Sequence, residues 1–197
     1  MRTENPFYSD YYRLRGDNKS NFRLLIDIVF RQNVRFMLYY RNYQRSRFKA
    51  TKLIYRFLLY IMSRKYGLEF STNAKIGEGI YLCHPYNITV GNGVVIGKNC
   101  TLYKGCTLWV DYRGSRQGAP TLGDCVFVGI NASVIGKVKI GEDVLIAPNS
   151  YVNFDVPSHS VVIGNPGRIF SRNGATDECV FNLIPWMNSS QKCRRRC

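Results

Sequence analysis

The fold is decided by residues 122–152, which read LGDCVFVGINASVIGKVKIGEDVLIAPNSYV. An aliphatic residue opens every sixth position here, and the same register extends back to Val90 with one break. The position after each opener is usually Gly or Ala, and the fifth position holds a compact side chain. This period matches neither the helical period of about 3.6 residues nor the two-residue period of a half-buried strand. The openers are Val90, Ile96, Leu102, Leu108, Leu122, Val128, Val134, Ile140, Ile146 and Val152.

A six-residue repeat predicts a mainly β chain that forms a solenoid with three flat faces. Each unit would form one short strand and one corner, three units would complete a coil, and the openers would stack into a dry core. We expect residues 67–170 to form this solenoid domain. A helical segment would precede it in residues 1–66, and residues 171–197 would form a mobile C-terminal tail.

The register of the repeat breaks twice. An earlier run with openers Phe70, Ile76 and Leu82 is separated from Val90 by eight residues, which inserts two residues within 83–87. Fourteen residues separate the openers Leu108 and Leu122, which inserts eight more. We expect residues 109–121 to project as a loop and to carry binding groups, because rigid stacked coils tolerate variation in their loops.

Basic residues are concentrated before the solenoid. Residues 1–66 hold 15 Lys and Arg against 4 Asp and Glu, a net +11, whereas residues 67–170 hold 8 against 7, a net +1. Apolar residues at helical spacing within 24–38 and 53–61 predict two or three helices. Two interpretations remain open: the helices cap the end of the solenoid and help to assemble a trimer, or their basic, aromatic-rich surface contacts anionic lipid at the inner face of a membrane. No recognition motif accompanies the charge, so we expect no nucleic-acid partner.

Targeting signals and cysteine usage indicate the cellular compartment of the protein. Neither an apolar run of membrane-spanning length nor a signal peptide is evident, which predicts a cytoplasmic protein. Cys100 and Cys106 occupy the compact fifth position of the repeat, where we expect reduced core thiols. Cys179, Cys193 and Cys197 have no histidine nearby, so we expect no metal site.

The chain has two histidines, His84 and His159. His84 falls within the two-residue insertion, where it would be pushed out of the regular strand at a corner. Acyl transfer to a hydroxyl needs a base with a pKa near neutrality, and imidazole suits that role. His84 is therefore the candidate general base. A carbonic anhydrase on such a solenoid would need three histidine ligands, which the chain lacks.

Three segments resemble the hexapeptide acyltransferase family, in particular its serine acetyltransferases and sugar O-acetyltransferases. They are residues 67–80 (GLEFSTNAKIGEGI), the His84 segment with residues 88–91, and residues 156–168 (VPSHSVVIGNPGR). The resemblance implies a left-handed parallel β-helix, a homotrimer with active sites between subunits, and acetyl-CoA as the acetyl donor. It also implies that an acidic residue fifteen positions before the base orients the imidazole. That residue is Glu69 here, where the family usually has aspartate.

The resemblance further implies which residues bind the donor. Pantetheine would pair with backbone groups in a groove between coils of adjacent subunits, and basic side chains would reach the CoA phosphates. The donor-binding residues so implied are Gly129, Ile130, Asn131, Ala132, Ala147, Lys137, Lys139 and Arg168.

The acceptor side departs from serine acetyltransferases at two places. Cys83 stands where those enzymes typically have an aspartate, and Gly118-Ala119 stand where they have an Arg-His pair. Without these ionic anchors, Arg113 and Arg116 remain to hold a carboxylate or an acidic sugar. We therefore expect the acceptor to be a sugar hydroxyl of a cell-surface polysaccharide or its precursor. Free serine, an amine acceptor, and a non-catalytic scaffold or acyl-CoA-binding solenoid remain alternatives. The implied substrate-binding residues are Cys83, Asp111, Arg113 and Arg116.

Overall fold

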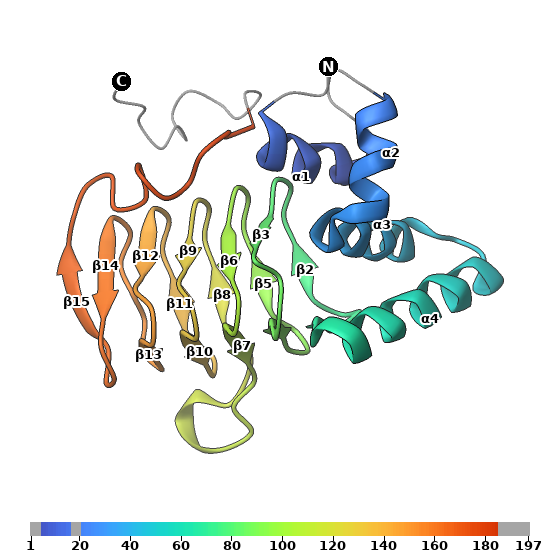
Figure 1. Ribbon diagram of the computed structural model, residues 1–197. Coiled ribbons are helices and arrows are strands. Elements are labelled where there is room, and N and C mark those ends of the chain that lie inside the picture. Colours follow the sequence, from blue (N-terminus) through green and yellow to red (C-terminus); the bar gives the residue numbers. More distant parts are fainter. Residues whose placement is uncertain (1–4, 17–20, 185–197) are drawn as a thin grey trace.

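The computed structural model describes residues 5–16 and 21–184, so Cys193 and Cys197 lie outside the described residues. Helices come first and short strands follow (Figure 1). The helices are α1 (Pro6–Arg15), α2 (Asn21–Phe30), α3 (Gln32–Arg45) and α4 (Lys49–Tyr66). The strands are β1 (Glu69–Phe70), β2 (Lys75–Ile76), β3 (Tyr81–Cys83), β4 (Thr89–Val90), β5 (Val95–Ile96), β6 (Thr101–Tyr103), β7 (Thr107–Trp109), β8 (Thr121–Leu122), β9 (Phe127–Val128), β10 (Ser133–Ile135), β11 (Lys139–Ile140), β12 (Val144–Ile146), β13 (Tyr151–Val152), β14 (Ser160–Ile163) and β15 (Arg168–Ser171).

The number of helices differs from the prediction. The patterns within 24–38 and 53–61 correspond to α2, α3 and α4, while α1 is a fourth helix that the sequence did not indicate. Tyrosine and polar residues dominate α1, so it lacks the aliphatic stripe that predicts an amphipathic helix. Asn5 caps its first turn through a side-chain hydrogen bond from the N–H of Phe7.

The strands form three sheets, one for each face of the solenoid (Figure 1). Face A holds β1, β4, β7, β10 and β13, and face B holds β2, β5, β8 and β11. Face C holds β3, β6, β9, β12 and β14, with β15 antiparallel at its end. Openers pair with openers one coil away, as Val90 does with Leu108 and Val134 with Val152. The predicted parallel solenoid and its register are therefore confirmed.

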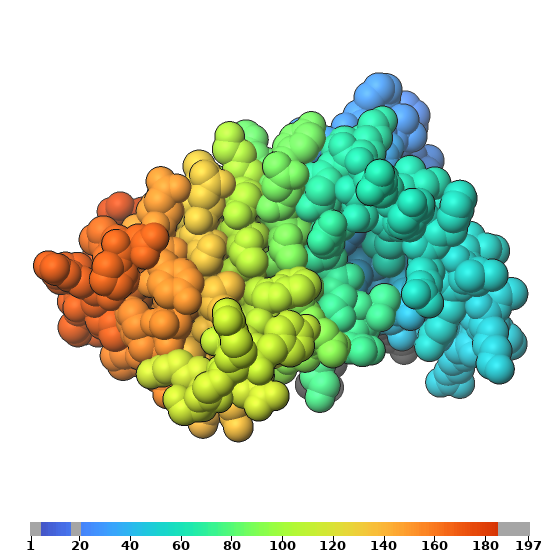
Figure 2. Space-filling model, turned by 90° about the horizontal axis from the view of Figure 1, so that it is seen from below, coloured from blue at the N-terminus to red at the C-terminus, as the bar shows by residue number. Residues whose placement is uncertain are grey.

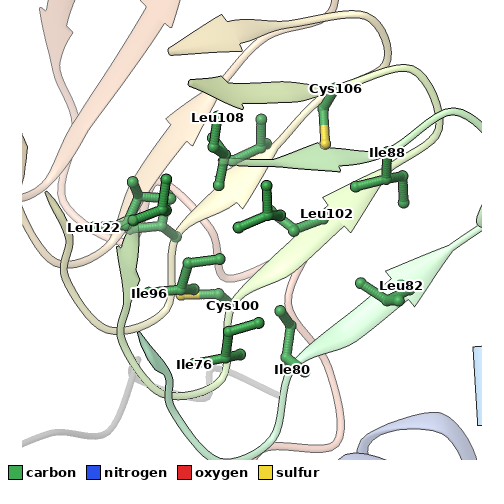
Figure 3. Packing of buried hydrophobic residues seen from close by; sticks show 14 of the residues in the cluster. Ile76, Ile80, Leu82, Ile88, Ile96, Cys100, Leu102, Cys106, Leu108 and Leu122 are labelled. Atoms are coloured by element: carbon green, nitrogen blue, oxygen red, sulfur yellow. The ribbon is translucent and has the colours of Figure 1, made fainter. Parts of the chain in front are cut away.

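The openers fill the interior of the solenoid (Figure 3). Every opener from Val90 to Val152 is at most 3% exposed. Cys100 and Cys106 pack among them as free thiols, and burial raises the pKa of each to about 12. Both thiols are therefore protonated at neutral pH, and the prediction of reduced core thiols is confirmed at these two positions.

Small residues after the openers allow the coils to approach closely. A Cβ atom added to Gly97 would lie 2.4 Å from the carbonyl oxygen of Gly123 and 2.5 Å from Asp124 Oδ1. No side chain fits this space unless the two coils separate. The glycine that follows Ile96 is thus a packing requirement of the stacked backbone at this corner.

A buried ion pair fastens α1 and α3 to the open end of the solenoid. Arg41 Nε lies 2.8 Å from Asp10 Oδ2, and both side chains are 3% exposed. Arg41 also donates to the carbonyls of Ile76 and Gly77 at 2.7 and 2.6 Å. Asp10 accepts a hydrogen bond from the N–H of Ile80 at 3.0 Å. These contacts show that α1 and α3 pack on the first coil of the solenoid, while a part for the helices in assembling a trimer stays a prediction.

The C-terminal segment 172–184 runs back along the corner between faces B and C toward α1 (Figure 1). The N–H of Thr176 donates to Asp143 Oδ1 at 3.0 Å, and the N–H of Ile184 donates to Asn99 Oδ1 at 3.3 Å. The expectation of a mobile tail is wrong for this part of the chain. Polar side chains at successive corners bind its backbone, which the hexapeptide pattern does not reveal.

Candidate active site

His84 lies at the corner between faces C and A, directly after β3. Its φ angle is +48°, in the left-handed region, and its carbonyl accepts a hydrogen bond from the N–H of Tyr86 at 2.8 Å. The imidazole is exposed. The two-residue insertion thus displaces His84 from the strand, as predicted. Eight other non-glycine residues in the described part of the chain also have a positive φ, so this conformation alone does not mark a functional site.

Glu69 lies on the neighbouring rung at the same corner, but not directly beneath His84. It pairs with Thr89 across β1 and β4, and its N–H donates to the carbonyl of Ile88 at 2.9 Å. Among the described residues, no hydrogen bond joins the side chains of Glu69 and His84. The structure therefore brings the two residues near one another without forming the expected dyad. Orientation of the imidazole by Glu69 stays a prediction.

An open groove of about 410 Å³ between α4 and face A contains Glu69 in its wall. Its other walls are mostly apolar and aromatic. Trp109, at the base of the projecting loop, is 39% exposed and lines the groove. The groove offers room for an extended ligand next to the Glu69 carboxylate. The aromatic and basic side chains of its wall are Phe36, Arg56, Tyr60, Phe70 and Trp109.

Cys83 is 8% exposed on β3 and pairs with Tyr103 of β6. A hydrogen bond with Cys83, and then burial, raise the pKa of Tyr103. Burial, and then Cys83, raise the pKa of Tyr81 to about 12. The ring centroid of Tyr103 lies 6.5 Å from that of His84. The surface beside His84 therefore presents a thiol and neutral phenols, and no carboxylate stands at position 83 to pair with an ammonium group.

The predicted loop projects between β7 and β8, at the corner between faces A and B (Figure 1). Asp111 and Gly118 exchange two backbone hydrogen bonds of 3.0 and 2.9 Å, which close the neck of the loop. Asp111 Oδ1 also accepts from the N–H of Arg113 at 3.0 Å. Asp111 therefore shapes the loop, while the side chains of Arg113 and Arg116 are exposed.

Within one chain, His84 and the loop arginines stand at different corners. His84 precedes face A at β4, whereas Arg113 and Arg116 follow face A at β7. The full width of this face separates them. The structure thus does not bring the candidate base and the candidate acceptor-binding arginines together in a single copy.

The residues expected to bind the donor fall into two groups. The first group lies at the same corner as His84, two and three coils further along. Adjacent strands are about 4.8 Å apart, so the rungs of His84 and Gly129 are roughly 10 Å apart. The group comprises Gly129, Ile130, Asn131, Ala132 and Ala147.

Most backbone N–H groups of this first group already donate hydrogen bonds within the solenoid. Those of Gly129 and Ala147 each donate to a carbonyl of the next coil at 2.8 Å, and those of Asn131 and Ala132 also donate within the solenoid. These four N–H groups are therefore not open to a pantetheine chain. The carbonyl oxygens of Gly129, Ile130, Ala132 and Ala147 also accept backbone hydrogen bonds, so a ligand would have to share them.

The second group of expected donor residues consists of three exposed basic side chains. Lys137 and Lys139 lie beyond face A, next to the loop, and the N–H of Lys137 donates to the carbonyl of Arg116 at 2.8 Å. One chain does not bring these two lysines to the first group. Arg168 begins β15 opposite Ile163, which is level with Ala147 on the neighbouring strand, so Arg168 lies at the same corner as the first group. Binding of CoA phosphates by these three side chains stays a prediction.

The second histidine has a structural partner that the sequence did not reveal. His159 Nδ1 lies 2.8 Å from Asp143 Oδ2, and Thr176 donates to Asp143 Oδ1 through both its N–H and its hydroxyl. Burial alone would raise the pKa of Asp143, but the hydrogen bonds from His159 and Thr176 hold it below the usual range. The two residues are sixteen positions apart at one corner, a spacing close to one coil that could have indicated the pair. This carboxylate clamps the C-terminal segment to the solenoid.

Replacing Asp143 with asparagine is expected to lower the thermal midpoint at pH 7. A carboxylate with a lowered folded pKa stabilises the fold above the ordinary value of 3.8, and this contribution is lost as the pH falls through the folded pKa. Asp143→Asn should therefore also lose less stability in acid than the wild type. Asp155→Asn is the matched control, because its exposed carboxylate accepts one backbone hydrogen bond from Lys139. Equal midpoints and equal acid dependence for Asp143→Asn and the wild type would contradict the clamp.

Comparisons with known proteins agree with the six-residue repeat and with the solenoid fold. Residues 119–153 match the family model described as bacterial transferase hexapeptide (six repeats). The matched residues lie within the solenoid, from just before β8 to just after β13. It is 37% identical over 122 residues to a serine acetyltransferase of Synechococcus elongatus, a match that covers 62% of this chain and 50% of that protein. It is 31% identical over 139 residues to a serine acetyltransferase of Staphylococcus epidermidis, covering 70% of this chain and 63% of that protein.

Solved structures also show a likeness between this chain and serine acetyltransferases. The crystal structure of Neisseria gonorrhoeae serine acetyltransferase in complex with serine matches with a TM-score of 0.70 and 26% identity, over 84% of this chain and 68% of that chain. The chain spans about half the length of the curated relatives that it matches first. These relatives favour the serine alternative, and they give no support to the polysaccharide O-acetyltransferase branch expected from the sequence.

Proposed function

We propose that the protein is an acetyl-CoA-dependent O-acetyltransferase whose acceptor is L-serine. The exposed His84, held by the insertion at a corner of the solenoid, is the observation that carries the reaction type. The acceptor is taken from the serine acetyltransferases to which the chain is similar. It replaces the polysaccharide sugar that the sequence led us to expect.

His84 supplies the proton chemistry of the proposed reaction. Acetyl-CoA provides an acetyl group activated as a thioester. Nε2 of His84 takes the proton of the acceptor hydroxyl as its oxygen attacks the thioester carbonyl, and the imidazolium then protonates the leaving thiolate. Glu69 lies on the rung next to His84, and we assign to it the orientation of Nδ1. No cysteine takes part in this direct transfer.

The active site is proposed to form between subunits of a homotrimer. The separation of His84 from Arg113 and Arg116 supports this arrangement, because a second copy can set its loop beside the first copy's His84. Light scattering combined with activity measurements is expected to show an active trimer. An active monomer would contradict a shared site. The proposed compartment is the cytoplasm, where acetyl-CoA is available.

A sugar hydroxyl remains a second candidate acceptor because of three specific residues. Cys83 is buried beside Tyr103, and Gly118-Ala119 stand at the other anchor positions, so the ionic grips typical of serine acetyltransferases are missing. A site without such partners discriminates poorly in favour of a small zwitterion.

Initial rates of CoA release with L-serine and with a panel of sugars and amino sugars test the acceptor. L-serine is expected to react faster than any sugar by roughly tenfold or more, since sites built for one acceptor commonly discriminate by at least this factor. Turnover with sugars alone would assign the acceptor to the second candidate. Turnover confined to amino sugars would overturn O-acetylation itself.

A further inference from the structure

Helix α4 carries a second apolar stripe that faces away from the protein. Its inner side packs on α3, with Met62 4% exposed and Tyr55 near Tyr39. Along the outer side, apolar residues follow one another at intervals of three and four, which places them on one helical face. These side chains are Leu53 (69% exposed), Ile54 (58%), Phe57 (61%), Tyr60 (60%) and Ile61 (44%).

Helix α2 repeats this arrangement. Leu24 and Ile28 pack against the core on its inner side. Its outer side carries apolar residues at i, i+3, i+4 and i+7, the spacing of an amphipathic helix face. They are Phe22 (73% exposed), Leu25 (62%), Ile26 (42%) and Val29 (59%). We refer to these four side chains and the five of α4 as the outward stripes.

The charge around the outward stripes has a single sign. Residues 21–66 contain eleven Lys and Arg and one acidic residue, Asp27. Asp27 is buried and forms ion pairs with Arg15 and Arg31. The exposed surface of α2 to α4 therefore carries no carboxylate. The basic residues on the exposed part of α4 are Lys49, Lys52, Arg56, Arg64 and Lys65.

An anionic bilayer surface fits this combination better than a second copy of the same face. Two copies would bring cation against cation with no carboxylate to compensate. A bilayer offers an acyl boundary for the apolar stripes and anionic head groups for the flanking Lys and Arg. Within residues 5–16 and 21–184, no helix has the length and apolar content to cross a bilayer. The helices would therefore lie in the plane of the interface.

We propose that the outward stripe of α4 binds the protein to the surface of an anionic lipid bilayer. Figure 2 shows α4, in cyan to teal, at the surface of the face seen from below. Arg56 and Tyr60 of α4 also line the groove that contains Glu69, so docking would hold this groove at the lipid surface. The proposal does not depend on the acceptor or on acetyl transfer.

Co-sedimentation of the full chain with vesicles tests this surface. Vesicles of phosphatidylcholine alone are compared with vesicles that also contain phosphatidylglycerol, at about 0.1 M and about 1 M salt. The stripe variant combines Leu53→Ser, Phe57→Ser and Ile61→Ser. The matched control combines Ile163→Ser and Phe170→Ser, which are 51% and 52% exposed at the far end of the solenoid.

The wild type and the control are expected to bind the phosphatidylglycerol vesicles equally at low salt. The partition coefficient should fall roughly tenfold or more in the stripe variant and at high salt. Equal binding by the stripe variant, or no binding of the wild type to anionic vesicles, would overturn the proposal. So would a lower sedimentation coefficient of the lipid-free stripe variant, because that result would assign the stripes to a contact between copies. CoA release, measured separately, keeps this outcome distinct from that of the proposed function.

Discussion

Replacing His84 with alanine is expected to lower kcat for acetyl transfer by about 10²- to 10⁴-fold. Removing a general base from the proton-transfer step typically costs a factor of this size. His84 is exposed at its corner, and its ring centroid lies 6.5 Å from that of Tyr103, so the fold should change little. Steady-state CoA release with L-serine, alongside circular dichroism, measures both quantities.

The second histidine provides the control for this substitution. His159 lies at a different corner, between faces B and C, and its imidazole is hydrogen-bonded to Asp143. His159→Ala should keep kcat near the wild-type value and should lower the thermal midpoint, because it removes one contact of the C-terminal clamp. Loss of activity in His159→Ala with retention in His84→Ala would exchange the roles of the two residues.

Arg41→Ala is expected to lower the free energy of unfolding by about 3–5 kcal/mol, the cost of removing one partner of a buried ion pair. The substitution leaves Asp10 buried without its counter-ion and removes the hydrogen bonds to the carbonyls of Ile76 and Gly77. Burial already raises the pKa of Asp10 and Arg41 opposes that rise, so Asp10 should be protonated more readily in the variant.

Urea unfolding followed by circular dichroism measures the effect of Arg41→Ala. The control is Arg47→Ala, an exposed arginine just after α3, which should change the free energy of unfolding by less than about 0.5 kcal/mol. A similarly small change for Arg41→Ala would show that the ion pair does not hold the helices to the solenoid.

The period of six was sufficient to predict the solenoid, because the stacked backbone imposes it. Leu108 and Val134 occupy one face and Leu102 and Val128 another, as counting units of six along the chain requires. The two departures from this count were equally informative. They located the corner of His84 and the loop of Arg113 and Arg116.

The repeat did not predict the directions of the side chains at the site. A spacing of fifteen residues places Glu69 on the rung next to His84, but the insertion rotates the backbone at His84 to a φ angle of +48°, which the spacing does not encode. The spacing also did not reveal that the N–H groups of Gly129 and Ala147, which were expected to bind pantetheine, donate hydrogen bonds to the next coil.

Helix α4 shows a different limit of sequence reasoning. Periodicity predicted an amphipathic helix, yet its apolar residues form an inner stripe around Met62 and an outer stripe around Phe57. A hydrophobic pattern alone does not reveal which stripe faces the protein, because both have helical spacing. Only packing on α3 distinguishes them.

Mass spectrometry of the products formed from acetyl-CoA and L-serine tests the proposed activity most directly. The wild type should yield O-acetylserine, and His84→Ala should yield far less at the same protein concentration. Absence of O-acetylserine with the folded wild-type trimer, or equal yields from the wild type and His84→Ala, would contradict acetyl transfer to serine with His84 as the base.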